Sequence, residues 1–268
     1  MPVIATTRNN IMAFNANRTC PQIRFIETVL NRTDRLHWHE QNAELARANG
    51  KRPYTVEMIP ASDGKDVTTM LQQWRELGIR FVTLWNGQKR AIGALGCNLS
   101  YLRALKRQLD EQIPYLMAME DDVKIAKPNF FHEAACFGAH LMGRSLELPG
   151  RTPIDFITFG YLASELFMTS LNGARAILSA YCDTGIVSNK DYQLFAHRGG
   201  VVLRIQPSGP GAAVARVGGT GHIRPLGHVL NGSRLNRESS TWPRPKWCPM
   251  ATPRGGWSGE LMSTRFYG

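Results

Sequence analysis

Short apolar stretches alternate with longer amphipathic stretches along the first 207 residues of the chain. The short stretches are rich in branched and aromatic residues, which is typical of strands. The predicted strands cover residues 23–30, 54–64 (with the loop that follows), 79–85, 115–119, 154–160, 166–170 and 201–207. The amphipathic stretches predict helices over residues 35–49, 68–77, 91–112, 130–142 and 172–182. Strands that alternate with helices predict an α/β fold with a mainly parallel central sheet.

The composition of the chain changes at about residue 208. The last part is rich in Gly, Pro and Arg, as in the stretch "WPRPKWCPMATPRGGWSG". We therefore expect three parts: a loose N-terminal leader at 1–22, an α/β domain at 23–207, and an irregular basic tail at 208–268. The tail is either mobile or becomes ordered over a ligand.

The charge balance favours an anionic partner. The chain has 268 residues, with 32 Lys and Arg against 21 Asp and Glu, which gives a formal net charge of +11. This excess suits nucleic acid, phosphorylated small molecules or an acidic membrane surface, and it does not choose among them. No stretch reaches the roughly 18 to 20 apolar residues that a bilayer span needs, and the start lacks the pattern of a signal peptide. We expect a cytoplasmic protein, or one peripheral to a membrane.

The cysteines do not have the pattern of a disulfide framework or of a zinc site. They are Cys20, Cys97, Cys136, Cys182 and Cys248. Their number is odd, they are widely spread, and no pair has the CxxC spacing. This pattern argues against a disulfide framework and against a zinc cluster. A reducing compartment is the simpler expectation.

The stretch "YLMAMEDDVKIAKP" (115–128) places three carboxylates directly after a buried strand. In open α/β sheets, ligands bind beyond the carboxyl ends of the strands, so Glu120, Asp121 and Asp122 face that crevice. Adjacent like charges repel unless a positive charge lies among them, and manganese (Mn²⁺) or Mg²⁺ is an economical partner. Such a metal neutralises a diphosphate leaving group. The alternative is an acidic turn in solvent.

The stretches around these acids follow one another in a characteristic order. They are "VLNRTDRLHWHEQ" (29–41), "MIPASDGKDV" (58–67), "GCNLSYLRALKRQLDEQIPYLMAMEDDVKI" (96–125), "IDFITFGYLASELFMTSLNGARAIL" (154–178) and "NKDYQLF" (189–195). The ordered set resembles glycosyltransferase family 25, which includes lipooligosaccharide and collagen galactosyltransferases. The resemblance covers about residues 23–207.

The resemblance implies a GT-A-like nucleotide-sugar-binding fold and a UDP-sugar donor, UDP-galactose or UDP-glucose. It also implies a metal-dependent, inverting transfer of the hexose to a hydroxyl of a glycan or protein acceptor. Glu120 and Asp122 become the metal ligands, Asp121 a donor-binding or catalytic acid, and Asp191 the general base or a second acid of the site. On an extended chain Glu120 and Asp122 point to one side and Asp121 to the other.

The chain departs from the family pattern in three places. Tyr101 stands where the family usually has His, and the first strand is atypical just before its turn. No Pro directly precedes Asp191, whereas the family has Asp in a Pro-x-Asp context. The alternative for Asp191 is an exposed acid on a helix.

Further residues are candidates for contacts with the donor: Arg32, Arg35, Asp63, Gly96 and Ser100. Arginine suits bidentate contact with phosphate, and a helix start such as that around Gly96 presents N–H groups that favour phosphate. Each candidate has a structural alternative. Asp34 caps the next helix between two solvated arginines, Asp63 and Gly64 form a plain turn, and Gly96 and Ser100 serve packing and capping.

Two other functions stay open. A basic chain with Arg among Trp in its tail fits nucleic-acid binding, although no finger, homeodomain or RNP signature is present and the basic residues are dispersed. The departures at Tyr101 and in the first strand fit a family-25-like chain without activity. The tail's tryptophans either stack on an acceptor sugar or pin the tail to the domain; they are Trp242, Trp247 and Trp257.

Overall fold

A computed structural model of the chain describes most of the predicted α/β domain and two short stretches of the predicted tail. The described residues are 23–30, 32–48, 54–79, 92–125, 130–147, 155–159, 165–184, 202–205, 214–216 and 243–249. The predicted leader, most of the predicted strand 79–85, and the residues Asp191, Trp242 and Trp257 lie outside them.

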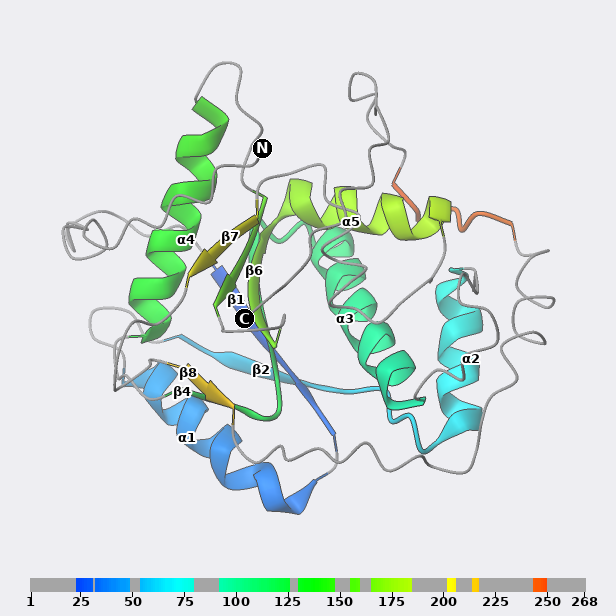
Figure 1. The fold of residues 1–268 in the computed structure, drawn as a ribbon, viewed down its shortest axis with the longest axis horizontal. Coiled ribbons are helices and arrows are strands. Elements are labelled where there is room, and N and C mark those ends of the chain that lie inside the picture. The colour runs from blue at the N-terminus through cyan, green and yellow to red at the C-terminus, as the bar shows by residue number, and fades with distance from the viewer. Residues whose placement is uncertain are drawn as a thin grey trace, which may run out of the picture.

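Six strands form one mixed sheet in the centre of the fold (Figure 1). In sheet order they are β2 (Val56–Pro60), β1 (Ile23–Val29), β3 (Tyr115–Glu120), β6 (Leu166–Ser170), β5 (Phe156–Phe159) and β7 (Val202–Ile205). Strands β2, β1 and β3 run parallel, β6 is antiparallel to both β3 and β5, and β7 is parallel to β5. The predicted α/β fold with a mainly parallel sheet is confirmed, with β6 as the reversed strand.

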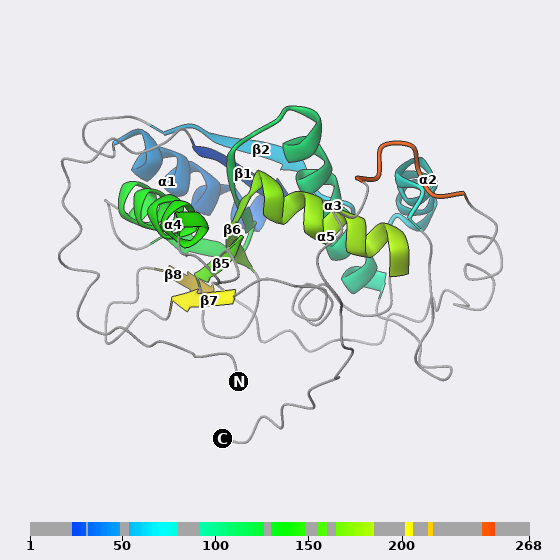
Figure 2. The ribbon, with the colours of Figure 1, turned by 90° about the horizontal axis from the view of Figure 1, so that it is seen from above.

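Helices cover both faces of this sheet, as Figures 1 and 2 show. They are α1 (Leu36–Arg47), α2 (Val67–Leu77), α3 (Ile92–Asp110), α4 (Phe130–Glu147) and α5 (Leu171–Thr184). Helices α2, α3 and α5 pack with Ile26 and Leu116 on one face, whereas α1 and α4 pack with Phe25, Met117 and Met119 on the other. Successive strand residues point to opposite faces, so a strand covered on both sides is apolar at nearly every position, as β3 is.

The order of the strands reverses between β1 and β3. From β1 the chain passes through α1 to β2 on one side, and it later returns through α3 to β3 on the other side. The three strands are parallel, so their carboxyl ends lie at the same edge of the sheet. Doubly wound sheets bind ligands at such a switch point, outside the carboxyl ends of the strands. A ligand site is therefore expected at the carboxyl ends of β1 and β3.

A small second sheet lies directly after β3. Strands β4 (Val123–Ile125) and β8 (Val214–Arg216) pair in antiparallel fashion. The hydrophobic pattern predicts neither strand, because three residues are too short to display a period. Strand β8 belongs to the predicted tail, so this part of the tail pairs with the domain. The proposed division into three parts otherwise stays a prediction.

A second stretch of the predicted tail, residues 243–249, packs against the helices on the α3 side of the sheet. Cys248 forms a disulfide with Cys182 near the end of α5. The Trp247 indole N–H donates a 3.1 Å hydrogen bond to the Leu77 carbonyl at the end of α2. Of the two roles that the sequence allows for Trp247, the structure therefore has the structural one.

The expectation of unpaired cysteines is wrong. Cys136 is disulfide-bonded as well as Cys182 and Cys248, while Cys97 keeps its thiol. Spacing does not reveal the pairing, because Cys182 and Cys248 are 66 residues apart and meet only through the fold. The expected cytoplasmic location stays a prediction, now without the support of reduced cysteines.

We expect Cys248→Ser to lower the free energy of unfolding by about 2–4 kcal/mol, because the disulfide restricts the unfolded chain over a long loop. Urea titration followed by tryptophan fluorescence measures the change. Cys97→Ser is the matched control and should leave the midpoint nearly unchanged. A reductant should lower the wild-type midpoint at least as far as that of Cys248→Ser, because it also opens the disulfide of Cys136. An unchanged midpoint in Cys248→Ser would contradict the structural role of the Cys182–Cys248 disulfide.

Candidate functional site

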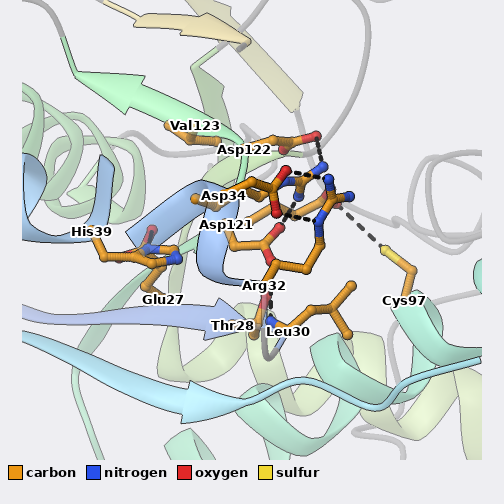
Figure 3. A network of polar contacts seen from close by, with 12 residues as sticks. Glu27, Thr28, Leu30, Arg32, Asp34, His39, Cys97, Asp121, Asp122 and Val123 are labelled. Atoms are coloured by element: carbon orange, nitrogen blue, oxygen red, sulfur yellow. Dashed lines mark hydrogen bonds and ion pairs between the residues drawn. The ribbon is translucent and has the colours of Figure 1, made fainter. Parts of the chain in front are cut away.

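The acidic turn, Glu120–Asp122, connects β3 to β4 and buries two carboxylates. Asp121 and Asp122 are only 5% and 4% exposed. The apolar side chains of β3 before them and Val123 after them are buried, which keeps the acids from turning outward to solvent. Figure 3 shows them beside Leu30, Arg32 and Asp34. Charges are rarely buried without partners, and a solvated acidic turn does not describe these two residues.

Asp121 joins the carboxyl ends of β1 and β3. One of its oxygens accepts a 3.0 Å hydrogen bond from the backbone N–H of Leu30, the residue that follows β1. The other oxygen forms an ion pair with Arg35. Hydrogen bonds to an ionised group are the strong ones, so the carboxylate fixes the two strand ends to each other and has its charge compensated there.

Arg35 supplies the positive charge among the acids. It ends the short 3-10 helix Thr33–Arg35 directly before α1. Its guanidinium contacts Asp121 and also lies 3.9 Å from the Asp122 carboxylate. The sequence predicts a divalent cation in this role and Arg35 as a contact of the donor. In the structure, Arg35 instead reduces the repulsion between the carboxylates of Asp121 and Asp122.

Arg32 lies beside the acidic turn and is exposed to solvent. Its guanidinium binds both carboxylate oxygens of Asp34, with an Nε–Oδ1 distance of 2.9 Å. These hydrogen bonds lower the pKa of Asp34. Asp34 does not cap α1, because the N-cap position is occupied by Arg35 and has no side-chain hydrogen bond. Arg32 is thus a cation at the rim of the buried acids.

Glu120 points toward a different helix from the two aspartates. Its Oε1 lies 3.4 Å from the Tyr101 hydroxyl and 3.4 Å from the Cys97 thiol, both on α3. Strand alternation predicted Glu120 and Asp122 on one side and Asp121 on the other. The strand ends at Glu120, however, and the next two residues form a turn, so both aspartates approach the same arginine.

A buried asparagine of α1 fixes the strand that follows the acidic turn. The Asn42 Nδ2–H donates a 2.8 Å hydrogen bond to the Val123 carbonyl, and the Asn42 Oδ1 accepts a 3.1 Å hydrogen bond from the Ile125 N–H. Asn42 is fully buried, so it satisfies two backbone groups that solvent does not reach. With Arg35 directly before it, α1 holds the acidic turn at two places.

A second buried ion pair lies next to Asp121. Glu27 of β1 and His39 of α1 are 0% and 2% exposed, with 2.6 Å between Glu27 Oε1 and His39 Nδ1. Burial raises the pKa of Glu27, and the charge of Asp121 adds to this effect. The hydrogen bond to Glu27 raises the pKa of His39, and Asp121 again adds to it. Sequence reasoning missed this pair, although an acid inside the apolar stretch "IRFIETV" (23–29) was the available signal.

The remaining candidate donor contacts have structural partners. Asp63 is exposed in the loop after β2, where its Oδ1 accepts a 2.8 Å hydrogen bond from the Lys65 N–H. The Ser100 hydroxyl accepts a 2.8 Å bond from the Ser62 N–H and donates a 2.9 Å bond to the Gly96 carbonyl. A Cβ at Gly96 would collide with the Ser62 carbonyl oxygen. Packing thus accounts for Gly96 and Ser100, while Asp63 is exposed beyond the carboxyl end of β2.

The structure therefore gathers four of the predicted site residues at the switch point. The four are Arg32, Arg35, Asp121 and Asp122. Glu120 faces α3, and the predicted base Asp191 lies outside the described residues. Buried carboxylates with cations beside them suit a ligand that brings both a metal ion and phosphate oxygens.

No protein-family model and no curated protein matches the sequence. The chain is similar in structure to a mutant of Drosophila β1,4-galactosyltransferase 7 in complex with manganese, UDP-Gal and xylobiose. The identity is 10%, the match covers 80% of this chain and 79% of that chain, and the TM-score is 0.41. It is also similar to a glycosyltransferase involved in the glycosylation of the major capsid of PBCV-1, with 11% identity, coverage of 82% and 99%, and a TM-score of 0.39.

A third similar structure is the 4-diphosphocytidyl-2C-methyl-D-erythritol synthase from Anaerococcus prevotii. The identity is 10%, the match covers 81% of this chain and 99% of that chain, and the TM-score is 0.36. At such identities and TM-scores these similarities concern the fold and assign neither a family nor an activity. The resemblance to family 25 therefore stays a prediction.

We expect Arg35→Met to lower the free energy of unfolding by about 3–5 kcal/mol, because it leaves the buried Asp121 without its charge partner. Arg32→Met is the matched control, since Arg32 is exposed and pairs at the surface. Adding Asp121→Asn to Arg35→Met should restore part of the loss by removing the uncompensated charge. Denaturant titrations compare the variants, and equal stability of the two single variants would contradict the role of Arg35.

We expect the stability that His39 contributes to fall as the pH rises. Its folded pKa is raised above 6.5, so its contribution is complete below pH 6.5 and is lost as the pH passes through the folded pKa. The raised pKa of Glu27 acts with the same sign above 4.5. Unfolding titrations should show that the wild type exceeds His39→Gln in stability at about pH 6 and that the difference shrinks toward about pH 9. A difference that grows with pH would contradict this sign.

Proposed function

We propose that the chain is a metal-dependent inverting hexosyltransferase. It transfers galactose or glucose from a UDP-sugar to a hydroxyl of a glycan or protein acceptor. The observation that carries the proposal is the burial of Asp121 and Asp122 beside Arg35 at the switch point of the sheet. The ordered set of family-25-like stretches supports it from the sequence.

The gathering of carboxylates in the acidic turn supports a divalent cation. The turn carries three carboxylates in succession, and those of Asp121 and Asp122 are buried beside Arg35. Mg²⁺ and Mn²⁺ prefer oxygen ligands, and carboxylates supply them.

The donor set fits a metal that is completed by the substrate. Among the described residues, no three His, Cys, Asp or Glu side chains gather to hold a metal by themselves. Mg²⁺ and Mn²⁺ are often held by one or two carboxylates together with substrate phosphates. Asp122 would hold the ion, and Glu120 would join it after its side chain turns from Tyr101 and Cys97 on α3, because Leu30 and Arg35 already occupy both oxygens of Asp121. When bound, the metal neutralises charge on the departing diphosphate.

The other residues divide the remaining tasks. Arg32 is exposed at the rim and suits a donor phosphate, since a guanidinium binds phosphate oxygens in a bidentate manner. Asp63, beyond the end of β2, suits a hydroxyl of the donor. Asp121, which the sequence also offered as a catalytic acid, positions the turn. Asp191 remains the proposed general base, which takes the proton of the acceptor hydroxyl as that oxygen attacks the anomeric carbon opposite the diphosphate.

No described feature favours nucleic-acid binding. Four basic side chains near α3 and in residues 243–249 form ion pairs with neighbouring acids. The pairs are Arg24–Glu111, Arg107–Glu57, Lys106–Asp110 and Arg244–Asp183. For the membrane, no helix in the described part of the chain combines the length and apolarity of a bilayer span. A cytoplasmic location, with or without peripheral membrane contact, remains part of the proposal.

We expect UDP-galactose or UDP-glucose with Mn²⁺ to raise the melting temperature of the wild type. A ligand at about 100 times its Kd stabilises the folded state by about 2.7 kcal/mol. Asp122→Asn should abolish the manganese-dependent shift because it removes a metal ligand. Asp110→Asn is the matched control, since Asp110 is an exposed acid that pairs with Lys106 on α3.

Hydrolysis of the UDP-sugar, measured with and without Mn²⁺, separates an active enzyme from a chain that only binds. If Asp122→Asn responds like the wild type, the metal does not bind at the acidic turn. If no sugar nucleotide stabilises the wild type, the proposed function is wrong.

A further inference from the structure

The buried pair Glu27 and His39 has no task in the proposed reaction. Within the part of the chain that the structure describes, Glu27 Oε2 and His39 Nε2 have no hydrogen-bond partner. Burying such atoms costs stability, and a buried ion pair is often replaceable by apolar residues without loss. Two buried ionisable groups beside a candidate ligand site indicate a role in that site.

The pair attaches α1 to β1 between the two residues through which α1 holds the acidic turn. His39 lies four residues after Arg35 and three residues before Asn42. Arg35 pairs with Asp121, and Asn42 binds the backbone of the first and last residues of β4. Figure 3 shows Glu27 and His39 on the β1 side of the same network. The fit of α1 against β1 therefore sets the position of the acidic turn.

We propose that Glu27 and His39 are positioning residues whose ion pair keeps α1 in the place that the donor site requires. While His39 is protonated, the pair has no net charge and its positive ring interacts favourably with Asp121. Arg35 and the acidic turn are then already in position when the donor binds. This inference rests on the proposed function, because the ligand it concerns is the donor of that reaction.

The charged groups around the pair explain what deprotonation does. Glu27 acts from β1, Arg35 from the start of α1, and Asp121 from the acidic turn, while the Asn42 amide favours the charged form of Glu27. The neighbouring strand β3 adds the uncharged Met117 and Met119 on this face. When His39 loses its proton to solvent, the buried Glu27 carboxylate remains near Asp121 without the positive charge of His39, and like charges repel strongly in the interior. The attachment of α1 weakens, and so does the site.

The direction of this effect follows from both residues. The pKa of His39 is raised mainly by its hydrogen bond to Glu27, and the pKa of Glu27 is raised mainly by burial. The folded chain therefore holds these protons more tightly than the unfolded chain does. We expect donor affinity to fall as the pH rises through the folded pKa of His39, since that proton keeps the ion pair intact.

The first test needs no ligand. An NMR titration of the His39 ring gives its pKa in the wild type, in Glu27→Gln and in Asp121→Asn. We expect both substitutions to lower this pKa, with the larger change in Glu27→Gln. Glu40→Gln is the matched control, an exposed acid on the same helix. An unchanged His39 pKa in Asp121→Asn would show that the pair and the acidic turn are not coupled, and it would overturn the proposal.

The second test measures UDP binding with Mn²⁺ by calorimetry between about pH 6 and about pH 9. We expect the wild-type Kd to weaken by about tenfold over this range, beyond the change that the nucleotide's own titration produces in both proteins. His39→Gln should bind UDP weakly throughout and lack this extra dependence. A purely structural role of the pair would lower stability and leave the two pH profiles parallel.

The outcomes separate this inference from the proposed function. Parallel profiles in wild type and His39→Gln overturn the inference and leave the proposed function standing. A wild type that binds no UDP at any pH overturns the proposed function, while the NMR titration still decides whether the pair is coupled to Asp121. If His39→Gln does not fold, the double variant Glu27→Gln/His39→Gln takes its place, because it leaves no uncompensated charge in the interior.

Discussion

The buried carboxylate of Asp121 is the contact on which the candidate site depends. It follows β3, accepts the N–H of Leu30 at the end of β1, and pairs with Arg35 at the start of α1. Three elements that meet at the switch point are thus held by one side chain. A carboxylate tolerates this depth only while its partners remain, because an unpaired buried charge costs several kcal/mol. The same contacts therefore stabilise the fold and set the geometry of the site.

The charges of the chain act at two length scales. The whole chain carries +11, which draws anionic ligands toward it. The acidic turn, in contrast, places three carboxylates in succession at the switch point, two of them buried beside Arg35. A ligand that combines a divalent cation with phosphates suits both features. Its phosphates are attracted by the positive net charge of the chain, and its metal ion binds the buried carboxylates. A simple anion has no such match at the turn. This is the physical reason to prefer a metal-bound sugar nucleotide over a plain anionic partner.

The elements could be predicted from the sequence, because a sheet covered on both faces leaves a clear alternation of apolar and amphipathic stretches. The acidic turn could be found as well, since three acids after an apolar strand are conspicuous. Pairings between distant residues could not be predicted, because spacing along the chain carries no trace of them. The Cys182–Cys248 disulfide, the β4–β8 pairing and the Glu27–His39 pair are of this kind. Arg35 was identified as a site residue, but its role beside Asp121 depends on a turn that strand alternation does not describe.

A crystal structure of the protein with Mn²⁺ and UDP, with the metal located by its anomalous signal, decides whether the acidic turn binds the metal. We expect a manganese signal at the acidic turn, in contact with Glu120 or Asp122 and with the diphosphate, while Asp121 keeps its contacts with Leu30 and Arg35. Manganese and nucleotide bound elsewhere on the chain, with the acidic turn unchanged, would contradict a metal site at the turn.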